Sequence, residues 1–247
     1  MSTPIQDSIA LVTGANRGIG RSIVEALLAR GAAKVYAAAR NPATLADLIS
    51  AHGSRVVPLT LDVTDPAQIS AAATAAADAT LIINNAGVMA SWDLFGEDIA
   101  GARQEFEVNY WGTLHMIRAF VPALKTHGGG TFVNLSSIAG LTNFPAVPTY
   151  SDSKAAVHSL TVGARLLLGQ ANINFVGVYP GPVETEMVKD IDLPKASSTD
   201  VATRILDGVE AGADEVFPDA MAAGYAGPYE AGHKTLERNV AAMLAGG

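Results

Sequence analysis

The sequence predicts an α/β fold in which a parallel sheet of about seven strands is doubly wound, with helices on both faces. Short runs rich in β-branched and aliphatic residues alternate along the chain with longer stretches of helical periodicity. Several of these runs are apolar without interruption, as expected of strands buried on both faces. The chain has 247 residues, of which 49% are hydrophobic, and no linker divides it, so we expect one domain over residues 1–247.

The elements follow in a regular order. The predicted strands are Ile9–Thr13, Lys34–Ala38, Val56–Leu59, Leu81–Asn84, Thr131–Leu135, Asn174–Tyr179 and Glu215–Phe217. The predicted helices are Ile19–Arg30, Pro42–Ala51, Pro66–Ala77, Gly101–His127, Tyr150–Gly169, Thr199–Ala211 and His233–Leu244. Asp65 before Pro66 is typical of a capped helix start, and Gly128–Gly130 of a helix end. The weakly patterned residues 182–200 are expected to form a flap over the ligand crevice.

Composition excludes several classes of function. Cysteine is absent, which removes disulfides, thiolate catalysis and cysteine-ligated metals. The net charge of −8 argues against a nucleic-acid partner. The apolar runs are too short to span a bilayer and no signal-peptide layout is visible, so we expect a cytoplasmic protein without a membrane partner. The five histidines have no metal-ligand spacing, so no metal is expected.

A glycine-rich turn, Thr13–Gly20, follows the first predicted strand and opens the first predicted helix. Its glycines have the spacing G-x-x-x-G-x-G. Glycine allows a tight turn and close approach of the backbone to a pyrophosphate, which then lies at the helix N-terminus. The position between a strand and a helix predicts a Rossmann-type dinucleotide site. Its expected contacts are Gly14, Asn16, Arg17, Gly18, Ile19 and Gly20.

The end of the second strand indicates which dinucleotide binds. An acidic residue there would bond the ribose hydroxyl of NAD, whereas an arginine accepts the additional phosphate of NADP. The second strand runs into Arg40 with no carboxylate nearby, and Arg17 adds a second positive charge. We therefore expect a preference for NADP(H).

Tyr150 and Lys154 are four residues apart in a predicted helix, so they share one face. A nearby ammonium favours the phenolate form of a tyrosine, which suits the phenol to acid–base catalysis. Ser137 ends a central strand, where its hydroxyl could stabilise charge on a substrate carbonyl oxygen. Asn109 lies within a helical pattern that asparagine does not favour, which suggests a hydrogen-bonding role.

Together these motifs resemble the short-chain dehydrogenase/reductase family, in its branch of about 250 residues. The resemblance covers nearly the whole chain and includes the usual thirteen positions from Ser137 to Tyr150. The motifs that carry it are T-G-x-x-x-G-x-G at Thr13–Gly20, Asp62-Val63, N-N-A-G at Asn84–Gly87, Asn109, Ser137, Y-x-x-x-K at Tyr150–Lys154 and Pro180-Gly181. One departure is a short, alanine-rich connection from Pro66 to Thr80.

The resemblance implies a role for each matching residue. Tyr150 would be the acid in reduction and the base in oxidation, and Lys154 would also bind the nicotinamide ribose. Ser137, rather than Ser136, would hold the substrate oxygen, and Asn109 would support a water-linked proton relay. The remaining cofactor contacts would be Asp62, Val63, Asn85, Ala86, Gly87, Pro180, Gly181, Val183 and Thr185. Ala39-Arg40 resembles the NADP-selecting pattern of the family's carbonyl reductases.

The substrate is predicted from the residues expected around the crevice. Trp92, Phe144 and Met187 are apolar, and no clustered Lys or Arg accompanies them, so a neutral hydrophobic or aryl ketone is expected. A 3-ketoacyl thioester reductase is an alternative, although an acidic carrier protein would favour a basic rim. A non-catalytic dinucleotide sensor is a further alternative, which retention of Ser137, Tyr150 and Lys154 argues against. Relatives commonly form homodimers or homotetramers, and the two long central helices suit such an interface.

Overall fold

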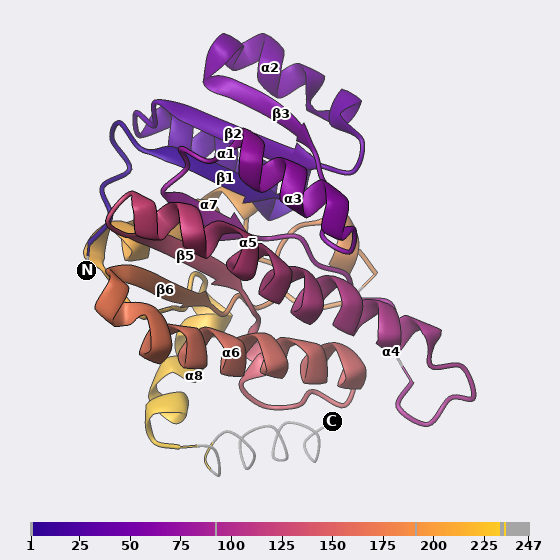
Figure 1. Ribbon diagram of the computed structural model, residues 1–247. Coiled ribbons are helices and arrows are strands. Elements are labelled where there is room, and N and C mark those ends of the chain that lie inside the picture. Colours follow the sequence, from indigo (N-terminus) through magenta and orange to yellow (C-terminus); the bar gives the residue numbers. More distant parts are fainter. Residues whose placement is uncertain (1, 92, 191, 233–234, 236–247) are drawn as a thin grey trace.

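Seven strands form one parallel sheet in the computed structural model, which describes residues 2–91, 93–190, 192–232 and 235 (Figure 1). The strand order is β3-β2-β1-β4-β5-β6-β7, which confirms the predicted doubly wound α/β fold. The order reverses between β1 and β4, and ligands bind at such a switch point in open α/β sheets. The strands are β1 (Ile9–Thr13), β2 (Lys34–Ala39), β3 (Val56–Thr60), β4 (Leu81–Asn84), β5 (Gly130–Leu135), β6 (Ile173–Val178) and β7 (Glu215–Val216).

Helices cover both faces of the sheet. On one face lie α1 (Gly18–Ala29), α2 (Ala46–His52) and α7 (Ser198–Ala211). On the other face, toward the viewer in Figure 1, lie α3 (Pro66–Ala75), α5 (Gly112–Thr126) and α6 (Pro148–Leu168). The short α4 (Ala100–Glu105) runs through a π-helical turn, Phe106–Trp111, directly into α5. None of the helices in these described parts of the chain is long and apolar enough to cross a membrane.

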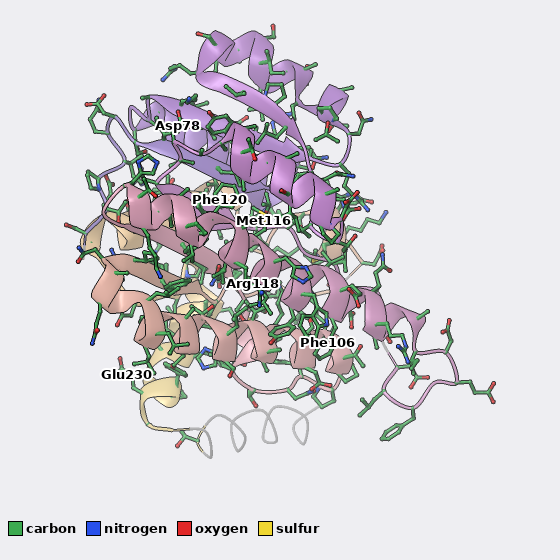
Figure 2. The ribbon with its side chains drawn as sticks, in the orientation of Figure 1. Asp78, Phe106, Met116, Arg118, Phe120 and Glu230 are labelled. Atoms are coloured by element: carbon green, nitrogen blue, oxygen red, sulfur yellow. The ribbon has the colours of Figure 1, made fainter. Side chains whose placement is uncertain are left out.

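The hydrophobic core is divided into two layers by the sheet. Successive residues of β1 alternate between them, with Val12 packed on the α1 side and Leu11 on the α5 side. Met116 and Phe120 of α5 are fully buried against the second face (Figure 2). Burying a side chain of this size contributes about 1.5–3 kcal/mol. The alternation explains why these strands read as uninterrupted apolar runs.

The structure differs from the predicted helices after β2 and after β7. The helix predicted over Pro42–Ala51 begins as a 3-10 turn, Pro42–Leu45, which Asn41 caps by accepting a hydrogen bond from the amide of Ala43. A helix that was not predicted, α8 (Ala220–Glu230), follows β7. It contains two glycines and a proline, which locally disfavour a helix. The helix predicted over His233–Leu244 lies outside the described residues, apart from Thr235.

Gly163 in α6 offers a test of local stability. A Cβ atom at this position would meet no other atom within 4 Å. Since glycine in a helix costs about 0.5–1 kcal/mol relative to alanine, Gly163→Ala is expected to raise the free energy of unfolding by about that amount. Urea denaturation of both proteins measures the difference. A destabilised variant would show that the space beside Gly163 is filled by a neighbouring group.

Candidate functional site

The predicted site residues meet at the carboxyl edge of the sheet. Asn84 pairs with Asn134 in the register of β4 and β5, and Leu135 pairs with Val178 in that of β5 and β6. The chain leaves these strands at one edge, and the segments that follow carry Asn85–Gly87, Ser137 and Pro180-Gly181. Four segments that are distant in sequence, the turn after β1 included, therefore meet at one edge of the sheet.

The glycine-rich turn is built for close backbone contact. Gly14 and Gly18 have φ of 63° and 53°, in the left-handed region that favours glycine. A Cβ atom on Gly20 would lie 2.2 Å from the carbonyl oxygen of Gly14 and 2.4 Å from Asn85 Nδ2. The turn thus packs closely against the N-terminus of α1, and its glycines add no side chains there. This arrangement fits a dinucleotide pyrophosphate.

Hydrogen bonds hold this turn to the segment after β4. Thr13 Oγ1 accepts from the amides of Asn85 and Ala86, at 3.0 and 2.9 Å. Asn85 Nδ2 donates to the carbonyl oxygens of Thr13 and Gly14, at 2.8 and 3.2 Å. Asn85 therefore faces the backbone of the turn. Its contacts make it a brace between two cofactor-facing segments.

The other residues predicted to contact the cofactor are spread around the turn. Arg17 and Arg40 are exposed and stand before α1 and after β2. Asp62 Oδ1 accepts hydrogen bonds from the amide and hydroxyl of Thr64, and Val63 is buried against Gly112. Thr185 lies over the turn, since a Cβ atom on Gly18 would be 2.9 Å from its Cγ2.

The predicted flap, residues 182–200, is tied together at its base. Val183 and Ala196 form an isolated parallel bridge. The amide of Glu184 donates to the carbonyl oxygen of Ala196, and the amide of Ala196 to that of Pro182, both at 2.9 Å. Between these contacts lies a short 3-10 turn, Glu186–Val188. The described part of the flap is thus a loop anchored at its base, and its residue Thr185 lies over the glycine-rich turn.

Tyr150 and Lys154 lie on one face of α6, as the spacing predicts. Lys154 Nζ is 5.7 Å from the centre of the Tyr150 ring, and it donates a 2.8 Å hydrogen bond to the carbonyl oxygen of Leu135. Ser137 lies close enough to the phenol of Tyr150 to lower its pKa. Ser137 Oγ also donates to the carbonyl oxygen of Pro180 at 3.2 Å. The phenol, the hydroxyl and the ammonium therefore lie together at the carboxyl edge of the sheet.

The ionisation of this pair differs from the expectation that Lys154 lowers the pKa of Tyr150. Burial raises the pKa of Tyr150 to about 12; the hydrogen bond with Ser137 opposes the rise and the negative charge of Glu105 adds to it. Burial lowers the pKa of Lys154 to about 8. The Lys154 ammonium is directed at the Leu135 carbonyl oxygen. Loss of hydration on burial is the largest cause of both pKa shifts. In the protein by itself Tyr150 is thus held as a proton donor.

Asn109 lies in the π-helical turn between α4 and α5. Its Oδ1 accepts from the amide of Val88, and its Nδ2 donates to the carbonyl oxygen of Val88 and to Ser153 Oγ. A Cβ atom on Gly87 would lie 3.2 Å from Asn109 Oδ1 and 3.3 Å from Lys154 Nζ. Asn109 and Lys154 are therefore neighbours across Gly87. Single π-helical turns are frequent at functional sites.

The three residues predicted to line the substrate pocket differ in where the structure places them. Trp92 lies outside the described residues. Phe144 is half-buried and packs against Tyr225 with ring centres 5.9 Å apart, within a cluster that also contains Leu141. Met187 is 38% exposed in the flap. Phe144 is thus engaged in packing against α8, while Met187 presents apolar surface.

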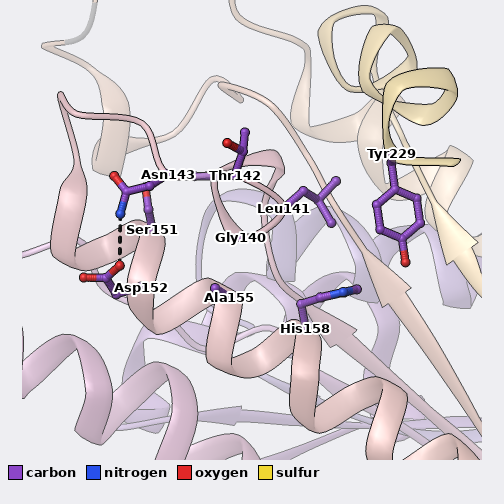
Figure 3. A pocket seen from close by; sticks show the side chains of 10 residues that line it. Gly140, Leu141, Thr142, Asn143, Ser151, Asp152, Ala155, His158 and Tyr229 are labelled. Atoms are coloured by element: carbon purple, nitrogen blue, oxygen red, sulfur yellow. Dashed lines mark hydrogen bonds between the residues drawn. The ribbon is translucent and has the colours of Figure 1, made fainter. Parts of the chain in front are cut away.

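A separate pocket of ≈ 440 Å³ lies between α6, the loop after β5 and α8 (Figure 3). Its lining includes Leu141, Asp152, His158 and Tyr229, and Asn143 donates a 2.9 Å hydrogen bond to Asp152 at its rim. None of the predicted catalytic residues lines it. It is distinct from the crevice that holds Tyr150 and Lys154.

Two buried acids beside the site were not predicted. Asp219 caps α8 through the amide of Ala222 and also accepts from the amide of Gly181, both at 2.8 Å, which fixes the Pro180-Gly181 segment. Glu105 is completely buried four residues before Asn109. A signal for Glu105 was present, since residues 105, 109, 116 and 120 recur on one helical face. The other residues of that face are buried, so a carboxylate at position 105 would need hydrogen-bond donors as partners.

Comparison with known proteins gives a consistent result. A family model described as short chain dehydrogenase matches residues 8–196. The chain is similar to a short chain dehydrogenase from Burkholderia cenocepacia J2315, solved in complex with NADP, with 42% identity and a TM-score of 0.89. That match covers 96% of this chain and 99% of the other.

Two further similarities are more distant. A short chain dehydrogenase/reductase from Burkholderia phymatum, solved in complex with NAD, has 26% identity and a TM-score of 0.82, with 90% of this chain and 92% of that chain covered. A 3-alpha-(or 20-beta)-hydroxysteroid dehydrogenase from Mycobacterium bovis is 36% identical over 194 residues, which cover 76% of this chain and 73% of that protein.

Proposed function

The chain belongs to the short-chain dehydrogenase/reductase family, and from this premise we propose that it is an NADP(H)-dependent oxidoreductase that interconverts a ketone or aldehyde and its alcohol. The observation that carries the proposal is the convergence of Ser137, Tyr150 and Lys154 beside the glycine-rich turn. A proton donor, an oxygen-binding hydroxyl and a cation in one crevice are the groups that carbonyl reduction requires.

Each side chain has a defined task in the proposed reduction. A bound nicotinamide dinucleotide supplies the hydride added to the carbonyl carbon. Ser137 Oγ donates a hydrogen bond to the carbonyl oxygen, and Tyr150 transfers its phenolic proton to the same oxygen. Lys154 binds the ribose hydroxyls and stabilises the phenolate that remains. Asn109, beside Lys154 at Gly87, supports the return of a proton through a water-linked relay. Oxidation of the alcohol reverses these transfers.

The substrate is proposed to be a neutral hydrophobic or aryl ketone. The exposed apolar surface of Met187 supports this, as does the similarity to a relative named for a hydroxysteroid. Consumption of NADPH and NADH with aryl ketones, aliphatic ketones and a 3-ketoacyl thioester tests both the activity and the class. Aryl ketones are expected to give the highest kcat/KM. Turnover confined to the thioester would identify a ketoacyl reductase, and turnover of none would contradict the proposed activity.

Arg40 and Arg17 are proposed to select NADP(H) through the additional phosphate. The NADP in the complex of the Burkholderia cenocepacia relative supports this choice. A charged hydrogen bond contributes about 1.5–3 kcal/mol, so Arg40→Asp is expected to raise the Kd for NADPH by about 10–100-fold. The Kd for NADH is expected to change little or to improve. Fluorescence titration of both cofactors measures the effect.

The control for this variant is Arg204→Asp. Arg204 is exposed on α7. Its replacement by aspartate changes the net charge by the same amount but leaves the end of β2 untouched. It is expected to leave both Kd values unaltered. Equal affinities of the unmodified protein for NADPH and NADH would contradict the proposed selection.

A further inference from the structure

Glu105 binds two segments of the chain through one buried carboxylate. Its side chain is fully buried at the end of α4. Oε1 accepts hydrogen bonds from the consecutive amides of Ala90 and Ser91, at 2.8 and 3.0 Å. Oε2 accepts a 2.6 Å hydrogen bond from the hydroxyl of Thr149. The segment after β4 and the first turn of α6 are therefore joined through this side chain.

The chemistry of these contacts makes the connection rigid. All three partners are donors, which suits an ionised carboxylate, since that group only accepts hydrogen bonds. Hydrogen bonds to an ionised group are shorter and stronger than those between neutral groups. A buried charge is tolerated only when such partners compensate its lost hydration. Displacing Ala90 and Ser91 would therefore leave an uncompensated charge in the interior.

The neighbourhood leaves the segment after β4 little freedom. Asn109, four residues after Glu105, forms hydrogen bonds with the backbone amide and the backbone carbonyl oxygen of Val88. A Cβ atom on Gly101 would lie 2.7 Å from the carbonyl oxygen of Ala90. Residues 88–91 are thus fixed at both ends by one continuous helix. At the other end of the connection, Thr149 immediately precedes Tyr150.

We propose that Glu105 is a positioning residue for the carbonyl site. By holding residues 88–91 against the first turn of α6, it sets the distance between the segment after β4 and the phenol of Tyr150. This inference rests on the proposed oxidoreductase function. In this role Glu105 aligns the bound carbonyl with its proton donor, Tyr150. The role involves no contact between Glu105 and the glycine-rich turn.

Glu105 also contributes charge at this place. The groups that face Tyr150 are Ser137 at the end of β5, Lys154 on α6 and Glu105 on α4. The negative charge of Glu105 raises the pKa of Tyr150, so Glu105→Gln lowers it. Reduction needs the protonated phenol, so its rate falls as the pH rises through that pKa. In Glu105→Gln this fall is expected at lower pH than in the unmodified protein.

The test compares Glu105→Ala, Glu105→Gln and the control Glu107→Gln, two residues further along and exposed. Amide hydrogen exchange reports whether residues 90–91 remain held, without any need for turnover. Glu105→Ala is expected to lose this protection and to lower kcat/KM for the carbonyl by about 10–100-fold, mainly through KM. Its Kd for NADPH is expected to stay unchanged. Glu105→Gln is expected to keep the protection and shift only the pH profile, and Glu107→Gln to match the unmodified protein.

Two outcomes would overturn the inference: unchanged exchange at residues 90–91 in Glu105→Ala, or faster exchange there with unaltered KM and kcat. If Glu105→Ala does not fold, Thr149→Val removes one donor of the same connection, and unchanged kinetics in that variant would likewise refute the role. Failure of the proposed function has a different signature. The unmodified protein would then reduce no carbonyl compound, while hydrogen exchange would still report on the contacts of Glu105.

Discussion

Replacing Tyr150 by phenylalanine is expected to lower kcat for carbonyl reduction by about 10²–10⁴-fold, the usual contribution of a positioned acid. The variant keeps the ring that lies beside Lys154 and removes only the hydroxyl, whose pKa Ser137 lowers. Burial raises the pKa of Tyr150 to about 12, so the phenol carries its proton at neutral pH, and the substitution removes that proton. The Kd for NADPH is expected to remain near that of the unmodified protein, since the glycine-rich turn is unaffected.

The measurement pairs single-turnover kinetics with cofactor titration. Tyr36→Phe is a matched control, because it removes a tyrosine hydroxyl that is bonded to Asp78 on the outer part of the sheet. It should leave kcat unaltered. Turnover of Tyr150→Phe at the unmodified rate would assign the proton to another group. Loss of NADPH binding in the same variant would instead indicate a structural role for the hydroxyl.

Gly20→Ala is expected to disrupt the dinucleotide site. The added Cβ atom would lie 2.2 Å from the carbonyl oxygen of Gly14 and 2.4 Å from Asn85 Nδ2, both within the turn or its brace. One of these groups must move, and overpacking of this kind costs about 1–3 kcal/mol. If the turn regains its shape only when the cofactor binds, that cost raises the Kd for NADPH by about 10–100-fold.

Isothermal titration with NADPH tests this expectation, with circular dichroism to verify the fold. Gly163→Ala is the control, because it makes the same change in α6 where no atom lies within 4 Å. Unchanged affinity in Gly20→Ala would show that the close packing of Gly14, Gly20 and Asn85 is not needed for cofactor binding.

The sheet was predictable because its signals are local. Apolar runs buried on both faces mark β1, β4 and β5 within one residue of their observed bounds. The loss of pattern after β6 likewise matches the segment with little regular structure before α7. By contrast, α8 was missed: its glycines and Pro228 disfavour a helix, and the cap from Asp219 and the packing of Tyr225 and Tyr229 on the core outweigh that preference.

For the candidate site, spacing predicted which residues share the crevice but not how they interact. The four-residue interval places Tyr150 and Lys154 on one helical face in any context. It does not show that the Lys154 ammonium donates to Leu135, which lies on another element. That contact and the depth of burial decide the direction of both pKa shifts. Burial therefore raises the pKa of Tyr150 in the protein by itself, and the expected lowering stays a prediction for the complex with the oxidised cofactor.

The sequence alone determined the parallel sheet, the glycine-rich turn and the identity of the residues at its carboxyl edge. Each follows from periodicity or from contacts between residues close in the chain. Only the tertiary structure decided that Glu105 joins Ala90 and Ser91 to Thr149, and that Asp219 fixes Gly181. These bonds connect residues 14 to 44 positions apart. Such contacts depend on how whole elements pack, and no local pattern encodes which buried acid will meet which amide.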